Sequence, residues 1–333
     1  MGAMRRLYFW WGVGVLLLVG ADRGFRTDSD LRELFLSEYR KVYDKLIQNY
    51  TNIEYSYRGD NPSGKGHVQM QEAEGKFDLN LYLLRSKGWI AKSDTREIVR
   101  EFRPVISGGN TKYAFEISKR GEGYLLRNWE PASPSGRVQF MPFIAPIADQ
   151  WTNRTYLEIA EDPETKFLEM RDTEYRGRKV KQLTVVVSHL DVVTKQPRRT
   201  KKSYFFDPMR GWVCVGWTHD IGTGTRYLES HHEYEGEVEY PPLKVIELGE
   251  RDHQNSKHYQ FRWRIEFTRF ERLGGKLDES EFTLSAFGLP EPVGVEWERP
   301  VRWYLWLMLA GVVCLVAGGV FYWLSRRRTG GTN

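Results

Sequence analysis

The first apolar pattern in the chain has the period of a helix. In residues 31–48, apolar side chains recur every three or four positions, which predicts an amphipathic helix that covers an apolar surface. Asp30 can cap its start, and Glu33 stands at capping-box spacing. The apolar stripe consists of Leu31, Leu34, Phe35, Val42, Leu46 and Ile47, with Tyr39 and Tyr43 at its edge.

From residue 53 onward the apolar pattern has a period of two. Ile53, Tyr55 and Tyr57 alternate with polar residues, and a turn-rich cluster follows at 59–66. Alternation that Gly-rich turns interrupt, for example at Gly75, is typical of an antiparallel meander. The predicted strands are 53–58, 67–72, 77–84, 112–118, 124–129, 180–193, 203–206, 212–218, 226–236, 243–248, 259–270 and 282–286.

These elements predict a mainly β (α+β) fold. We expect a curved antiparallel sheet or open β-barrel with an N-terminal amphipathic helix and a C-terminal transmembrane helix. Residues 140–159 are apolar but contain Pro142 and Pro146, so we expect a loop and a short helix over one face or rim. The basic stretch 196–202 is predicted as a hairpin turn, either solvated or in contact with anionic lipid headgroups.

The predicted transmembrane helix is the uncharged segment 303–324. Its 22 residues span about 33 Å as a helix, which matches a hydrocarbon core of about 30 Å. Basic residues directly after the segment predict a cytoplasmic C-terminus. A buried helix of a soluble protein is the alternative. The expected interfacial aromatic residues are Trp303, Tyr304, Trp306, Tyr322 and Trp323, and the expected topology signal is Arg326, Arg327 and Arg328.

The N-terminal residues resemble a secretory signal peptide. Arg5 and Arg6 precede the apolar run 7–19, and small residues follow before the expected cut after Ala21. An uncleaved anchor is the alternative. The predicted organisation is a signal peptide at 1–21, an exported β-rich domain at 22–290, a Pro-rich stalk at 291–302, the transmembrane helix at 303–324 and a tail at 325–333.

Charge and cysteine content narrow the function classes. The formal net charge is +5, and the five arginines of the two terminal segments account for all of it, so the predicted exported domain is neutral. We therefore exclude nucleic acid as a partner. Cys314 lies in the predicted span and Cys214 in the exported domain, so no internal disulfide is expected.

The order of the elements resembles the bacterial outer-membrane-lipoprotein carrier (LolA/LolB-like) superfamily. Two local segments are similar to it: SYFFDPMRGW at 203–212, a strand–turn–strand, and FTLSAFGLPEP at 282–292, a closing strand and stalk. The resemblance implies an unclosed β-barrel around a helical plug, with an apolar concave face for acyl chains. It also implies a periplasmic domain on a bacterial inner membrane. A membrane anchor departs from carriers that cross the periplasm, so the resemblance implies binding rather than transport.

The expected site is a hydrophobic groove for a lipid or a hydrophobic protein partner. Ordinary core beneath the first helix is the alternative use of the same residues. Neighbouring strand residues point to opposite faces, so His231 and His232 are not expected to chelate one metal ion together. The predicted groove residues are Tyr55, Tyr57, Leu81, Leu83 and Trp89.

The function that the sequence favours is a non-enzymatic, membrane-anchored envelope protein that binds lipid, with no cofactor. A ligand-free interaction or sensor domain is the second hypothesis. A hydrolase is the third, and it would need convergent carboxylates or a Ser/His pair, of which the sequence shows no motif.

Overall fold

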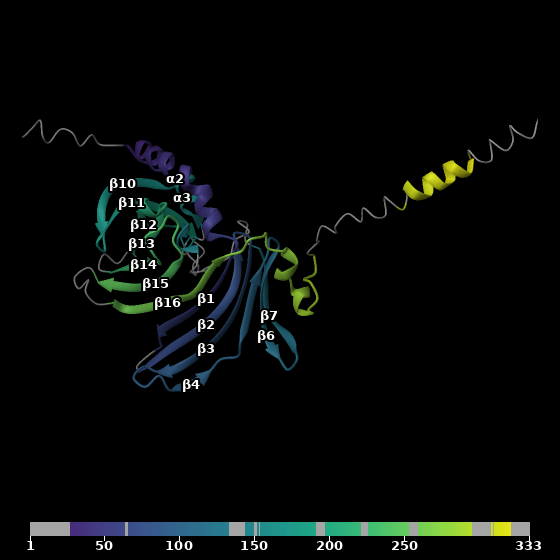
Figure 1. The fold of residues 1–333 in the computed structure, drawn as a ribbon. Helices are drawn as coiled ribbons and strands as arrows, with labels where there is room; N and C mark the ends of the chain where they lie inside the picture. Colours follow the sequence, from purple (N-terminus) through teal and green to yellow (C-terminus); the bar gives the residue numbers. More distant parts are fainter. Residues whose placement is uncertain are drawn as a thin grey trace, which may run out of the picture. The chain divides into compact units, whose positions relative to one another are not determined.

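The computed structural model of the chain describes residues 27–63, 66–132, 144–149, 154–190, 197–220, 226–252, 259–294 and 310–320, together with 152 and 308 (Figure 1). The chain divides into two compact units, Met1–Pro290 and Glu291–Asn333.

Fourteen of the strands described in the first unit form a single antiparallel sheet. The first strand of the meander, β1, pairs with the last, β16, so the two lie side by side within the sheet (Figure 1). The sheet is not closed, because β10 and β7 are its two edges. In sheet order the strands are β10 (Lys166–Tyr175), β11 (Arg178–Leu190), β12 (Pro197–Asp207), β13 (Val213–Asp220), β14 (Arg226–Tyr234), β15 (Leu243–Asp252), β16 (Tyr259–Arg272), β1 (Ile53–Pro62), β2 (His67–Asp78), β3 (Leu81–Lys92), β5 (Val105–Gly109), β6 (Tyr113–Arg120) and β7 (Gly123–Pro131), with β4 (Ile98–Glu101) paired to β3.

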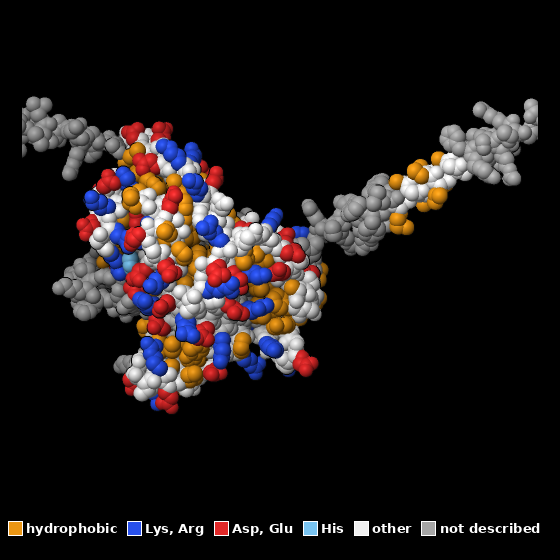
Figure 2. Space-filling model, in the orientation of Figure 1, with side chains coloured by type: hydrophobic (Ala, Val, Ile, Leu, Met, Phe, Trp, Pro, Cys, Tyr) orange, Lys and Arg blue, Asp and Glu red, His pale blue; other side chains and the backbone are white. Residues whose placement is uncertain are grey.

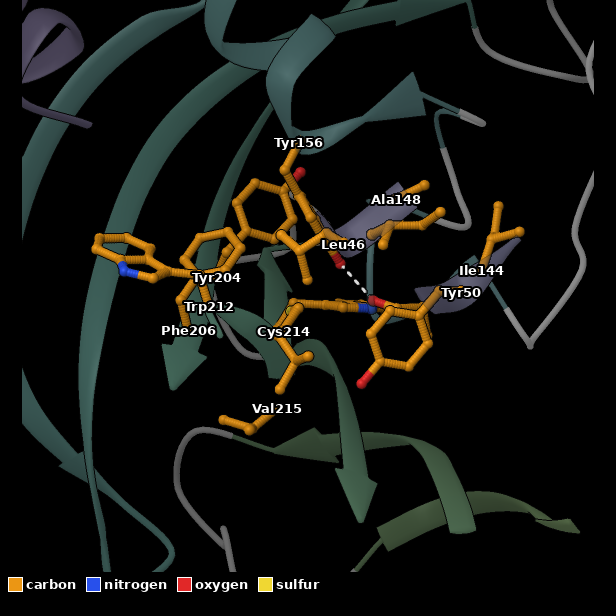
Figure 3. Close-up of a cluster of buried hydrophobic side chains, with 14 of the residues drawn as sticks. Leu46, Tyr50, Ile144, Ala148, Tyr156, Tyr204, Phe206, Trp212, Cys214 and Val215 are labelled. Carbon is orange, nitrogen blue, oxygen red and sulfur yellow. Dashed lines mark hydrogen bonds between the residues drawn. The ribbon is translucent and has the colours of Figure 1, made fainter. Parts of the chain in front are cut away.

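The predicted N-terminal helix is present as α2 (Asp28–Tyr50). Thr27 is its N-cap and Asp30 is the third residue of the capping box, so the cap lies three residues before the predicted one. Phe35 and Tyr39 are fully buried on its apolar face, and their rings stack with centroids 5.0 Å apart. This face packs into the aromatic core of the sheet, part of which Figure 3 shows.

A second part of the core comes from residues 144–162. They contain the short paired strands β8 (Ala148–Asp149) and β9 (Arg154–Thr155) and the helix α3 (Tyr156–Glu161). Tyr156 of α3 lies with its ring 5.0 Å from that of Tyr204 and 5.1 Å from that of Phe206 (Figure 3). The short helix expected in 140–159 is thus confirmed, and of the two expected places, one face or the rim, it lies against the inner face of the sheet.

Arg32 joins α2 to this second segment. Its guanidinium donates hydrogen bonds to the backbone carbonyls of Ala160 at 2.8 Å and Asp162 at 2.7 Å. A third hydrogen bond reaches the carbonyl of Thr165 at 2.5 Å. These carbonyls lie at and beyond the C-terminal end of α3, so a positive side chain satisfies acceptors that the helix leaves unpaired.

Residues 197–207 form strand β12, and not the predicted turn over 196–202. Lys202 points inward, where its ammonium forms an ion pair of 2.5 Å with Asp149 of β8. The exposed fractions of the two side chains are 0% and 1%. The Tyr204 hydroxyl donates a hydrogen bond of 2.6 Å to the same carboxylate. Burial lowers the pKa of Lys202, against the attraction of Asp149. The pair fastens the 144–149 segment to the wall of the sheet.

Two further expectations about local structure are wrong. The chain does not turn at Gly75, because β2 continues to Asp78 and turns at residues 79–80. Residues 282–286 are not a strand: they lie in the 3₁₀ helices η3 (Glu279–Phe282) and η4 (Leu284–Phe287), with Thr283 between them. The Asp278 and Thr283 side chains each accept a backbone N–H at the start of one of these helices, which favours helical turns over a strand.

In the second unit, residues 310–320 are helical, and the side chains described there are exposed. Of the predicted span 303–324, only residues 308 and 310–320 are described. No helix in the described part of the chain is both long and apolar enough to cross a membrane. The expected signal peptide at 1–21 and every expected interfacial aromatic and topology arginine lie outside the described residues, so these remain predictions.

We predict that Lys202→Met strongly destabilises the first unit. The substitution leaves the Asp149 carboxylate buried without its cation, and breaking a buried pair in this way costs about 3–5 kcal/mol. The double variant Lys202→Met/Asp149→Leu should recover a large part of the loss, because neither charge of this pair then remains buried. Urea unfolding followed by tryptophan fluorescence measures both. A single variant within about 0.5 kcal/mol of the parent would contradict the role of this pair.

Candidate functional site

A groove with a volume of about 460 Å³ lies on the half of the sheet that contains β1–β3 and β5–β7. Its floor is the backbone of four residues that lie opposite one another on neighbouring strands, from β1 to β5. They are Tyr57, Ala73, Ser86 and Val105. Its walls carry Arg58, Glu72, Glu74, Arg85, Lys87, Ile106, Lys119 and Tyr124. We call it the outer groove.

The alternation of side chains along the strands shows which face the outer groove occupies. Tyr57 and Ala73 are buried in the hydrophobic core on the inner face. Because neighbours along a strand point to opposite faces, Arg58, Glu72 and Glu74 point outward. All three are at least partly exposed, in agreement with this assignment. The outer groove therefore lies on the face of the sheet opposite the aromatic core.

Positive charge exceeds negative charge in the outer groove, with four cationic and two anionic side chains among those that line it. Arg58 pairs with Glu72 at 3.0 Å, and Arg85 approaches Glu74 only at 3.8 Å. Lys119 is exposed and forms no ion pair with any described residue. Exposed ion pairs are weak, typically worth about 0–1 kcal/mol, so these cations can exchange partners at little cost.

The C-terminal 3₁₀ segment holds the far wall of the outer groove in place. Phe287 of η4 packs edge-on against Tyr124 of β7, with ring centroids 5.3 Å apart, and also contacts Phe115 at 5.9 Å. Nearby, the Tyr113 hydroxyl accepts a hydrogen bond of 2.9 Å from the backbone N–H of Leu284. The aromatic wall therefore depends on residues that lie far apart in the sequence.

The structure does not bring the five predicted groove residues together on one face. Tyr55 and Tyr57 point inward and are buried, with parallel rings 6.3 Å apart. Through the strand pairing, Tyr55 lies in line with Leu84 of β3 and Tyr57 with Ser86, so these residues share the inner face. The other three predicted residues, Leu81, Leu83 and Trp89, occupy the alternate positions of β3 and point to the outer face.

The sequence did not predict the outer groove, because its residues have the pattern of an ordinary solvent-exposed strand face. Arg58, Glu72, Arg85 and Lys87 occupy the polar positions of strands in which polar and apolar residues alternate. The one available signal was that these polar positions recur on consecutive strands. Only the curvature of the sheet adds Lys119 and Tyr124, which lie beyond β5, to the same groove.

The rings of His231 and His232 point to opposite faces, as strand alternation predicts. His232 is buried, with Nδ1 2.8 Å from the carbonyl of Cys214 and Nε2 2.9 Å from the hydroxyl of Ser230. His231 lies on the outer face beside Tyr175. Among the described residues, no group of three or more His, Cys, Asp or Glu is placed to hold a metal ion. His253 and His258 lie outside those residues.

Cys214 is a buried, unreactive thiol. Its exposed fraction is 0%, and burial raises its pKa to about 12, so it stays protonated at neutral pH.

Solved structures with some similarity to this chain belong to different kinds of protein. One is a LolA superfamily protein from Nitrosomonas europaea, with 6% identity and a TM-score of 0.39 over 74% of this chain and 97% of that one. Another is a putative lipoprotein from Parabacteroides distasonis, with 10% identity and a TM-score of 0.19 over 66% and 95%. A third is kievitone hydratase from Nectria haematococca, with 7% identity and a TM-score of 0.18 over 65% and 89%.

No protein-family model matches the chain, and no curated protein matches it significantly. The resemblance to the lipoprotein-carrier superfamily is therefore a weak one at the level of the fold, and it assigns the chain to no family.

We predict that acid destabilises the first unit through His232. Burial lowers the pKa of His232 to about 4, against 6.5 for a free histidine. Above pH 6.5 the ring is neutral in both states. Between about pH 6.5 and 4 the unfolded chain binds a proton that the folded chain does not, so about 3 kcal/mol of stability is lost.

The measurement is the free energy of unfolding of the parent and of His232→Asn at several pH values in this range. The difference between the two should shrink as the pH falls, and the matched variant His67→Asn should keep the acid-dependent loss of the parent. A constant difference between the parent and His232→Asn would contradict the prediction.

Proposed function

We propose that the first unit is a non-enzymatic binding domain whose outer groove holds an anionic lipid. The observation that carries this proposal is the excess of positive charge in a groove with an aromatic wall. We further propose that the domain stands outside a bacterial inner membrane, on a single helix formed by residues 303–324.

The cations of the outer groove suit the phosphate headgroup. Arg85 and Lys87 lie on β3, and Lys119 lines the same groove from β6, on the other side of β5. Among the described residues, Arg85 has a 3.8 Å ion-pair contact with Glu74, and Lys87 has a 3.6 Å contact with Glu101. A phosphate offers stronger, charge-assisted hydrogen bonds and can replace these contacts.

The apolar part of the lipid fits the adjoining strand β7. Tyr124 lines the outer groove, and Leu126 and Trp129 follow it on the same outer face. Leu126 is 36% exposed and Trp129 is 39% exposed, which leaves a strip of apolar surface beside the cations. Figure 2 shows hydrophobic side chains at the surface over β6 and β7, next to lysines and arginines. Basic and apolar surface in contact is the arrangement that an anionic amphiphile requires.

The inner face is a poorer choice for the same ligand. α2, α3 and residues 144–149 occupy the concave side of β10–β15, and Phe35, Tyr39 and Trp217 are fully buried there. A ligand on that side would have to displace packed aromatic side chains, at a cost of several kcal/mol for each.

Binding without catalysis is supported by the composition of the outer groove. The residues that line it include no histidine or cysteine. Both carboxylates, Glu72 and Glu74, are exposed and face arginines. Neither sits in the apolar surroundings that prepare a carboxyl group for general acid catalysis.

The proposed anchor rests on the uncharged segment 303–324. Its described residues are helical, and Val312, Leu315 and Val316 expose more than half of their surface. A helix that exposes valine and leucine in this way needs an apolar environment.

We predict that Arg85→Gln/Lys87→Gln weakens the binding of dioctanoyl phosphatidylglycerol by about tenfold or more. This factor corresponds to about 1.4 kcal/mol, the scale of one charge-assisted contact. Calorimetry on the full chain in a neutral detergent measures the affinity. The matched control, Arg171→Gln/Lys179→Gln on the edge hairpin β10–β11, should bind as the parent does. Equal affinity of all three proteins would overturn the outer groove as the lipid site.

We predict that Val313→Arg releases the protein from the membrane. A charged residue at the centre of a spanning helix costs about 2.5–3.5 kcal/mol of insertion free energy. Alkaline carbonate extraction of membranes should leave the parent chain in the pellet and move part of the variant to the supernatant. Ser325→Arg, just beyond the predicted span, should behave like the parent. A parent chain that is fully extracted by carbonate would contradict the anchor.

A further inference from the structure

A second, smaller cavity lies at the other end of the sheet, separate from the outer groove. Its volume is about 220 Å³, and its walls come from the β10–β11 turn, from η2 (Pro208–Arg210) and from β14. The residues that matter below are Arg176, Arg178, Arg210, His231 and Glu233, all of which line it. We call it the arginine pocket.

The β10–β11 turn places two of the arginines. Tyr175 and Arg178 are paired, so the loop between the strands has only two residues, Arg176 and Gly177. Both have positive φ angles, 50° and 80°, as a tight hairpin turn requires. The Arg176 guanidinium lies 3.7 Å from the buried carboxylate of Glu229 and 4.0 Å from that of Glu247. Its charge is therefore already balanced within the protein.

The other two arginines form a fork around one carboxylate. Arg178 binds Glu237 with both terminal nitrogens, at 3.0 and 2.8 Å. Arg210 reaches the same carboxylate with one nitrogen at 2.6 Å. Two guanidinium groups on one carboxylate lower the pKa of Glu237 to about 2. This geometry is the one by which proteins recognise carboxylates and phosphates.

Arg210 is unusual because it is buried, with only 4% of its side chain exposed. Its Nε has no hydrogen-bond acceptor among the described residues, and its contact with the Asp207 carboxylate is 3.8 Å long. His231 Nδ1, in the same pocket, also lacks a described hydrogen-bond partner. Burial lowers the pKa of His231 to about 3, so the ring is neutral and presents a polar nitrogen without a charge.

Glu237, in contrast, belongs to the surface. Its side chain is 71% exposed, and it follows Gly236, whose φ is 76°, in the irregular segment 235–240 between β14 and β15. A buried guanidinium therefore takes its anion from an exposed residue outside any strand or helix. A carboxylate in this position can leave the fork for water without exposing any core.

We propose that the arginine pocket is a binding site for a phosphate group and that Glu237 is the internal anion that a ligand displaces. A phosphate presents at least two oxygens to Arg178 and Arg210 in the arrangement that the Glu237 carboxylate now uses. Glu233 at the wall disfavours a ligand with several charges, and the small volume excludes acyl chains. The site takes a single phosphate, free in solution or at the end of a lipid headgroup.

The test is calorimetric titration of the full chain with inorganic phosphate at constant ionic strength. Glu237→Gln should bind phosphate about tenfold more tightly than the parent, because the competing carboxylate is gone. Glu237→Gln/Arg178→Gln should lose this gain, whereas Glu237→Gln/Arg171→Gln should keep it. Arg178 is the arginine to replace because its side chain is 42% exposed, so its removal leaves the buried Arg210 in place.

The same titration with dioctanoyl phosphatidic acid distinguishes the source of the phosphate. A gain with inorganic phosphate identifies a free anion, and a gain with the lipid alone identifies a headgroup. Either result supports the proposal if it depends on Arg178. Equal affinity of the parent, Glu237→Gln and Glu237→Ala for both inorganic phosphate and the lipid would show that Glu237 is only a structural tie, and would overturn the proposal. Arg85→Gln/Lys87→Gln should leave phosphate binding in this pocket unchanged. The proposal for the arginine pocket is therefore tested independently of the proposal for the outer groove.

Discussion

The pairing of β1 with β16 holds the first unit together. Ile53 lies opposite Arg272, so the strand that follows the N-terminal helix meets the last strand of the meander. Through this pairing, two runs of hairpins become one sheet, in which the first and last strands lie in the middle of the strand order and not at its edges. Closing so long a loop costs entropy that local hairpins do not. The side-chain contacts across the seam, such as Tyr57 against Phe267, have to offset that cost.

The two faces of this sheet have different chemistry. On the inner face, the helices and residues 144–149 bury aromatic side chains and the ion pair of Lys202 with Asp149. On the outer face, the charged side chains of β1–β3 remain in contact with water and with one another. The inner face therefore holds the aromatic core, whereas the outer face combines solvated charges on β1–β3 with a smaller buried cluster, Phe115 and Ile117 of β6, that packs beneath η4.

Both binding sites proposed here use arginine on the outer side of the sheet, but in different ways. The outer groove offers loosely paired, exposed cations beside apolar surface, which suits an amphiphile. The arginine pocket offers a buried guanidinium, Arg210, and a rigid fork with Arg178, which suits a small oxyanion. The difference follows from burial, because a buried cation requires a defined counter-charge whereas an exposed one exchanges partners freely.

The sequence by itself determined the amphipathic helix, most of the strands and the mainly β class, because helical and alternating periods are local properties of the chain. It also determined that His231 and His232 face opposite sides. It did not determine whether Leu83 or Leu84 shares a face with Tyr55. A shift of one residue in the pairing of β2 with β3 would move every side chain of β3 to the opposite face, and the structure selects Leu84. Nor did it show that Lys202 is buried, since only Asp149, from a distant segment, makes that position tolerable. Register, curvature and the partners of buried charges arise between segments far apart in the chain, and only the tertiary structure decided them.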